Sequence, residues 1–136
     1  MLNKILKDIQ AHRNPKKAKL LAGFFKTGQG QYGEGDIFWG LTVPVSRTLA
    51  MKYRDITLKE IQALLKNKVH EVRLIGILVL VHRYKSFAIA QDDFAKSEIV
   101  EFYLQNTKYI NNWDLVDLSA SRILGDYLVN KKNKNI

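Results

Sequence analysis

The sequence predicts an all-α fold, built either as a helical bundle or as a helical solenoid. Apolar residues recur at helical spacing along most of the chain, and no two segments read as paired strands. Asn14-Pro15 and the Thr57/Glu60 pair are helix-start signals. Tyr53-Arg54 and Tyr84-Lys85 end two predicted helices about one helical repeat apart, which favours the solenoid.

The first part of the chain is expected to hold three short helices separated by a loop. The second helix starts at Asn14-Pro15, because asparagine caps helices and proline suits the first turn. Gly28 ends it, and Pro44 begins the third helix. Residues 28–43 read as a loop, because Gly28, Gly30, Gly33 and Gly35 break any regular period. The apolar stripes of these helices are Leu2, Ile5, Leu6 and Ile9; Ala18, Leu21, Ala22 and Phe25; and Val45 and Leu49.

The fourth helix has the clearest start in the sequence. Thr57 and Glu60 have capping-box spacing, and Ile56 and Ile61 are placed to form a hydrophobic staple. This helix is expected to end near Lys66.

Three longer helices are expected to follow. Residues Leu74 to Val81 are all apolar apart from Gly76 and could form a buried strand, but polar flanks extend the pattern over residues 69–84. That length exceeds most strands, so a helix is predicted. Helices over residues 93–106 and 111–129 complete the set. The buried face expected for the last one consists of Val116, Ala120, Ile123 and Tyr127.

The chain is strongly basic, with 22 Lys and Arg against 13 Asp and Glu, a net charge of 22 − 13 = +9. Such a surface attracts polyanions, so nucleic acid is the expected partner, with an anionic membrane or simple solvation as alternatives. The basic clusters are Lys16, Lys17 and Lys19, and Lys131, Lys132 and Lys134. We expect one domain over residues 1–129 and a polar, basic tail over residues 130–136.

Several other classes of protein are disfavoured. There is no cysteine, which excludes disulfides, thiolate metal sites and a cysteine nucleophile. No segment resembles a signal peptide or a membrane span, so a cytoplasmic location is expected. The G-x-G-x-x-G match at residues 28–33 lacks the strand before it and the helix within it that dinucleotide binding requires. His12, His70 and His82 are scattered, so neither a metal nor a cofactor is expected.

Two short motifs carry candidate functional residues. Glu71 and Arg73 lie near a helix start and are interpreted as structural, through capping or a surface ion pair. Trp113 and Asp117 are four residues apart at another helix start and would share one face. Asp114 beside them suits the positive end of the helix dipole. The pair therefore fits either a helix start packed on the core, or an aromatic and a carboxylate that receive a cationic ligand.

The sequence resembles the DNA alkylation repair glycosylases of the AlkD type. The matching residues occur in the same order as in that family: residues 30–36, Phe38, residues 40–44, Arg47, His70-Glu71-Val72-Arg73, and residues 112–117. The resemblance implies stacked antiparallel pairs of HEAT-like helices, an α-solenoid with a concave basic face for duplex DNA. It also implies excision of cationic alkylpurines such as 3-methyladenine and 7-methylguanine. By position, Asp117 matches the catalytic carboxylate and Trp113 an aromatic that contacts the lesion nucleotide.

The resemblance also implies further helical repeats after the last helix of this chain, carrying another aromatic and a basic residue that face the lesion. We therefore expect that residues 1–136 correspond to the N-terminal part of the family length, and that this chain alone is weakly active or inactive. The alternative is a non-catalytic helical module that binds nucleic acid or protein. The sequence leaves the lesion preference and the oligomeric state open.

Overall fold

Packed helices make up nearly all of the structure. The computed structural model describes residues 1–24, 37–110, 115 and 119–129. The elements are α1 (Leu2–Ala11), α2 (Pro15–Phe24), α3 (Val43–Lys52), α4 (Leu58–Leu65), α5 (His70–Ile89), α6 (Asp93–Gln105), the 3-10 turn η1 (Thr107–Tyr109) and the π-helical turn η2 (Ser121–Gly125). In these described ranges the one strand-like pairing is an isolated parallel bridge between Ile37 and Val69. The predicted all-α repeat fold is confirmed.

Helix α5 is the centre of the fold. Thirteen of its twenty residues are buried, and it packs against α3, α4, α6 and η2. A helix that is apolar on every side needs such cover. The run from Leu74 to Val81 is therefore helix and not strand. At Gly76 an added Cβ would lie 3.2 Å from the Cβ of Leu64, so glycine allows α4 to approach closely.

The observed helix ends show which signals in the sequence were sufficient to predict where a helix begins or ends. The capping box of α4 is present, since Thr57 Oγ1 accepts from the Glu60 N–H and Glu60 Oε1 accepts from the Thr57 N–H. The predicted end of α5 at Tyr84 was wrong, because the helix continues to Ile89. It stops just before Gln91, whose φ of 58° is left-handed. No glycine marks that stop, so this helix end could not be predicted from the usual C-terminal signal.

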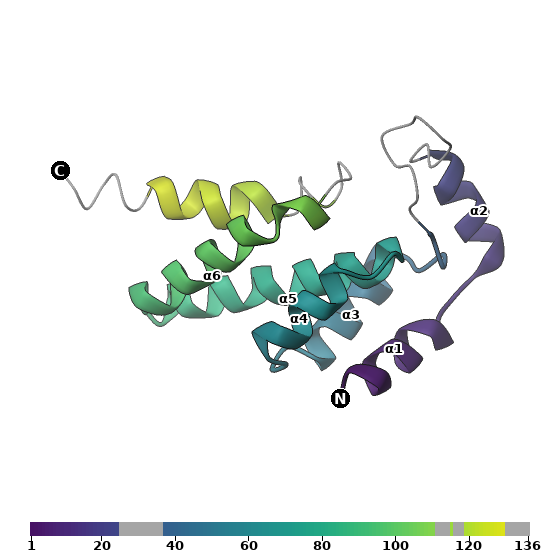
Figure 1. Ribbon diagram of the computed structural model, residues 1–136, viewed down its shortest axis with the longest axis horizontal. Coiled ribbons are helices and arrows are strands. Elements are labelled where there is room, and N and C mark those ends of the chain that lie inside the picture. The colour runs from purple at the N-terminus through teal and green to yellow at the C-terminus, as the bar shows by residue number, and fades with distance from the viewer. Residues whose placement is uncertain (25–36, 111–114, 116–118, 130–136) are drawn as a thin grey trace.

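Successive helices run back and forth along the molecule (Figure 1). Helix α5 runs from right to left in this view, α6 returns, and the C-terminal helical segment (residues 119–129) runs left again. Helices α1 and α2 lie together at the right-hand end. The molecule therefore has an N-terminal end formed by α1 and α2, and an opposite end where α5 turns into α6.

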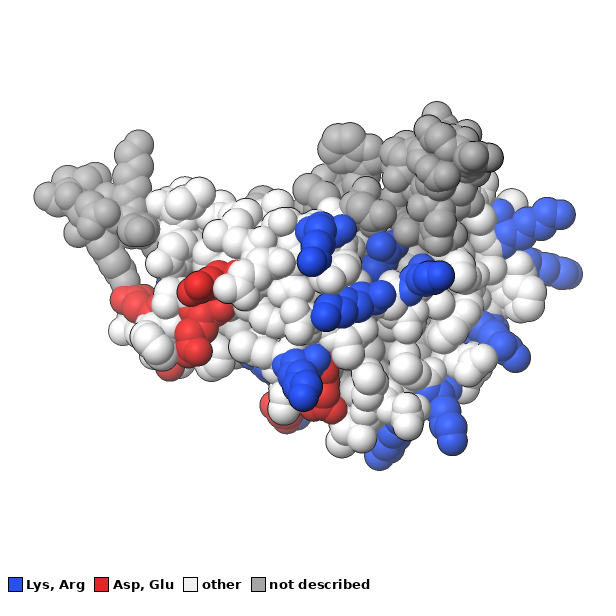
Figure 2. Space-filling view, in the orientation of Figure 1, with Lys and Arg blue, Asp and Glu red and all other residues white. Residues whose placement is uncertain are grey.

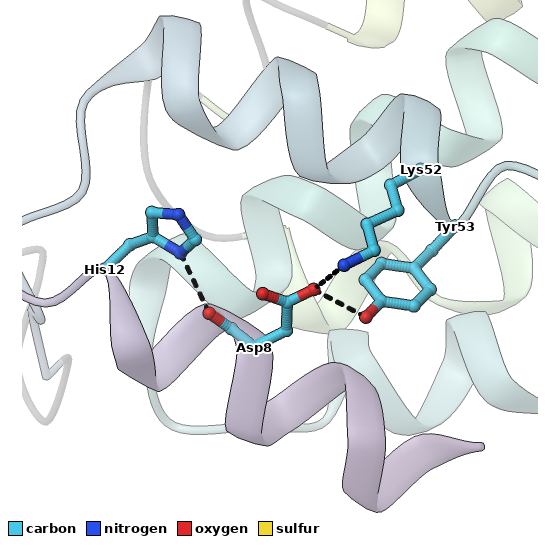
Figure 3. A network of polar contacts seen from close by, with 4 residues as sticks. All are labelled: Asp8, His12, Lys52 and Tyr53. Atoms are coloured by element: carbon cyan, nitrogen blue, oxygen red, sulfur yellow. Dashed lines mark hydrogen bonds and ion pairs between the residues drawn. The ribbon is translucent and has the colours of Figure 1, made fainter.

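Helix α1 places two side chains in the core and is joined to the end of α3 by one polar cluster. Ile5 and Ile9 are fully buried. Between them, Asp8 Oδ2 accepts hydrogen bonds from Lys52 Nζ and from the Tyr53 hydroxyl, each at 2.6 Å (Figure 3). These two hydrogen bonds hold the pKa of Asp8 below its usual value of 3.8.

Because the pKa of Asp8 is lowered on folding, the stabilisation by this carboxylate is complete above about pH 4 and is lost as pH falls through the folded pKa. Asp8→Asn should lower the melting temperature by about 3 °C at pH 7. The difference between variant and parent should shrink below pH 4. Thermal unfolding of both proteins from pH 7 to pH 3 measures this. A difference that stays constant over that range would show that the charge of Asp8 does not attach α1.

Candidate nucleic-acid interface

The two site residues predicted from the sequence, Trp113 and Asp117, lie outside the described residues. Their neighbour Leu115 is described and is fully buried. Ser119 Oγ donates to the Leu115 carbonyl at 2.6 Å, and because this uses its one proton, the Tyr103 hydroxyl donates to Ser119 Oγ at 2.8 Å. The start of the C-terminal helical segment is thus fastened to α6 next to the predicted site.

Part of the buried face expected for the last helix lies among the described residues. Ile123 is buried as predicted, Ala120 and Tyr127 are only half-buried, and Leu115 and Ser119 are buried as well. The predicted Val116 lies outside the described residues. The π-helical turn η2 adds a residue to the turn after Ser119, and turns of this kind are frequent at functional sites.

A basic groove runs between α3, α5 and the C-terminal helical segment. It encloses a cavity of about 210 Å³. We call it the α3/α5 groove, and its lining residues are Arg47, Ala50, Met51, Leu78, Val81, His82, Lys85 and Arg122. Three of its four polar lining residues are lysine or arginine, and the other four lining residues are apolar. A concave, cationic surface without a lining carboxylate suits a phosphate backbone.

A second cavity, of about 420 Å³, continues from the groove along α5 and shares Lys85 and Arg122 with it. One carboxylate lines this part, that of Asp126, which accepts a hydrogen bond of 2.7 Å from the Tyr84 hydroxyl. Burial, followed by this bond to Asp126, raises the pKa of Tyr84 above its usual value. Tyr84 therefore stays a neutral donor at physiological pH, and the pair joins α5 to the C-terminal helical segment.

The positive charge of the chain is concentrated in its N-terminal half. Residues 1–68 carry 13 Lys and Arg and 5 Asp and Glu, or 13 − 5 = +8, against 9 − 8 = +1 for residues 69–136. Figure 2 shows blue side chains over the right and centre of the visible face and red ones mainly at the left, where α5 turns into α6. The net positive charge thus lies mainly on the part of the chain that forms α1 to α4.

Glu71 holds the segment that leads into α3. Its Oε1 accepts the N–H of Trp39 at 3.1 Å, and its Oε2 accepts those of Gly40 at 2.7 Å and Leu41 at 3.1 Å. The side chain is 2% exposed. Glu71 has a structural role, as predicted from the sequence. The two predicted forms of that role, helix capping and a surface ion pair, were wrong, because the buried carboxylate accepts hydrogen bonds from the backbone of residues 39–41. Arg73 is also buried, so a surface ion pair does not describe it either.

The same segment contacts α2 and α5 through other residues. Gly40 has a φ of 85°, and a Cβ there would lie 2.0 Å from the carbonyl oxygen of Asn14. The Asn14 N–H donates to the Trp39 carbonyl at 2.6 Å. The ring of Phe38 stacks on His70 with centroids 4.6 Å apart. Segment 37–42, which contains part of the family-like pattern, thus joins α2, α3 and α5.

Sequence reasoning identified one of the cationic groove residues, Arg47, as part of a pattern and missed the others. Arg122 is far from His82 and Lys85 in sequence, and none of the three belongs to a motif. His82 and Lys85 are three residues apart and so share one face of a helix. This spacing is equally common on helices whose polar face only contacts solvent, so it does not indicate a binding site.

Metal binding and membrane insertion were also considered for the described part of the chain. No group of three His, Asp or Glu side chains there is arranged to hold a metal ion. None of the helices in that part is long and apolar enough to span a membrane.

The packed helical repeats and the basic groove place this chain in the class of helical-repeat proteins, with a groove whose charge is complementary to an anionic polymer. Comparison with known families agrees, since the profile described as "DNA alkylation repair enzyme" matches residues 5–136. The chain belongs to this family. No curated protein and no solved structure shows significant similarity to it. The family suggests DNA as the partner.

Proposed function

We propose that this protein is a DNA glycosylase that excises cationic alkylpurines, such as 3-methyladenine and 7-methylguanine, from duplex DNA. Asp117 is the proposed catalytic carboxylate and Trp113 the proposed contact to the lesion nucleotide. The family match over residues 5–136 is the observation that carries the proposal. The α3/α5 groove supports it, because its cations can neutralise backbone phosphates beside the lesion.

The chemistry fits a single carboxylate. An N3- or N7-alkylated purine is already a cationic leaving group, so no general acid is needed. Departure of the base leaves oxocarbenium-like charge on the deoxyribose, which a carboxylate stabilises while it positions the attacking water. Two opposite charges ~4 Å apart at an effective dielectric of ~20 gain about 4 kcal/mol. That corresponds to roughly a thousandfold in rate.

The proposal predicts release of free 7-methylguanine from methylated duplex DNA, measured with protein in excess over DNA so that even slow excision is detected. Duplex affinity should fall steeply with salt, and the triple variant R47Q/K85Q/R122Q should reduce the slope of log K against log salt by about 2–3. A folded protein that binds duplex DNA in this way but releases no base would instead be a non-catalytic nucleic-acid-binding module. Undetectable duplex binding at low salt would contradict both functions.

A further inference from the structure

Helix α2 is exposed to an unusual degree for a helix of a folded domain. It is ten residues long, and none of its described side chains is buried. Three lysines, Lys16, Lys17 and Lys19, stand in its first turn and a half, and Arg13 lies just before it. No acidic residue occurs between Asp8 and Glu34. The Asp8 carboxylate is itself already bonded to α3.

The three lysines share one side of α2. At 100° per residue, Lys19, Lys16 and Lys17 fall within an arc of roughly 160°, and all three are exposed. The half-buried residues Ala18, Leu21 and Ala22 occupy the other side. None of the three lysines makes an ion pair with a described residue. The outward face of α2 is therefore a cationic strip of three lysines, with the exposed Leu20 among them.

The start of α2 is joined to segment 39–41 by a hydrogen bond and by close backbone contact. The Asn14 side chain accepts from the Lys17 N–H at 3.2 Å at the start of α2, and the Asn14 N–H is bonded to Trp39. Gly40 comes so close that a Cβ would lie 2.8 Å from the Ala18 nitrogen. Since Glu71 fixes the Gly40 N–H, α2 is linked through segment 39–41 to the central helix α5.

Three lysines near the N-terminus of α2 destabilise this helix when no anion is bound to it. Cations near a helix N-terminus oppose the helix dipole, typically by 0.3–1 kcal/mol each at exposed sites, so helix stability does not explain them. An external anion would reverse this effect. Helix α2 is ten residues, or about 15 Å, long, which is enough to follow about two successive phosphates of one DNA strand.

We propose that α2 is a second DNA-binding element, which grips backbone phosphates of the duplex outside the α3/α5 groove and without regard to sequence. This inference rests on the proposed function only in taking duplex DNA as the partner. A membrane surface fits less well, because a membrane-binding helix sets an apolar face beside its basic one. Here the apolar residues Ala18, Leu21 and Ala22 are half-buried, and Leu20, 74% exposed, is the exception.

The test compares two triple variants that lose the same charge. K16Q/K17Q/K19Q removes the strip, and K59Q/K66Q/K68Q removes three exposed lysines on and after α4. For a ~25-bp duplex, the α2 variant should make the slope of log K against log salt less negative by about 2–3, with about tenfold or more lost affinity near 0.1 M salt. The α4 variant should change both the slope and the affinity much less.

Three further measurements make the outcome decisive. The melting temperature of the α2 variant should not fall, because the lysines oppose the helix dipole. Equal losses in the two variants, or no loss in the α2 variant, would overturn the proposal. So would loss of binding to phosphatidylserine vesicles with DNA binding unchanged, which would identify a membrane contact. If the parent releases no 7-methylguanine yet its DNA binding depends on α2, the proposed enzyme fails and this inference stands.

Discussion

In a chain that carries the further helical repeats of the family, Asp117→Asn is expected to slow the release of 7-methylguanine by about 100- to 1000-fold, the range that corresponds to the loss of one carboxylate–oxocarbenium interaction. Asparagine keeps the shape and the hydrogen-bonding ability of the side chain and removes only the negative charge. Because that charge acts mainly in the transition state, affinity for methylated duplex should change by less than about twofold. Single-turnover release, with binding measured on the same preparations, separates the two effects.

Asp114→Asn is the matched control, since it removes an identical charge from the same short segment. Its effect on excision should be far smaller, with a modest loss of stability expected for a carboxylate at a helix start. Equal rates for Asp117→Asn and the parent would mean that Asp117, like Asp114, is only a carboxylate at a helix start. Equal losses in both variants would mean that the general negative potential of the segment, and not one carboxylate, supports the reaction.

Glu71→Ala is expected to reduce the free energy of unfolding by about 3–5 kcal/mol, the range for removing one partner from a buried charged network. The substitution would leave the N–H groups of Trp39, Gly40 and Leu41 without their shared acceptor. Glu71→Gln should cost less, since one amide oxygen remains as an acceptor, but its NH₂ group would face donors. Urea denaturation followed by circular dichroism measures both losses.

Glu98→Ala provides the comparison, because Glu98 is an exposed carboxylate on α6. Its effect should stay within about 0.5 kcal/mol, as for most surface substitutions. If Glu71→Ala were as mild as Glu98→Ala, the segment 39–41 would not depend on the buried carboxylate. The positions of α2 and α3 would then be set by their apolar contacts alone.

Local signals in the sequence were enough to predict most of the helices. The Thr57/Glu60 capping box lies within four residues of chain, and the start of α2 follows directly from Asn14-Pro15. The helical state of residues 74–81 followed from the length of the pattern around them. The family match confirms the resemblance first seen in ordered motifs such as His70-Glu71-Val72-Arg73.

The features that could not be predicted depend on contacts between distant parts of the chain. Glu71 bonds to backbone groups 30 to 32 residues earlier, and nothing in its own neighbourhood indicates this. The groove cation Arg122 lies in a π-helical turn, which has no simple sequence signal. The roles of Trp113 and Asp117 stay predictions, since both residues lie outside the described part of the chain.

The central position of α5 bears on how the molecule unfolds. In an ideal solenoid each repeat contacts only its neighbours, and stability is close to a sum over repeats. Here α3, α4, α6 and η2 all pack on one helix, so opening any of them exposes the same buried surface. Amide protons of α5 should therefore exchange only when the whole core unfolds. Helix α1, with two buried residues, and α2, with none described, can open separately, as a low-stability unit at one end of a cooperative core.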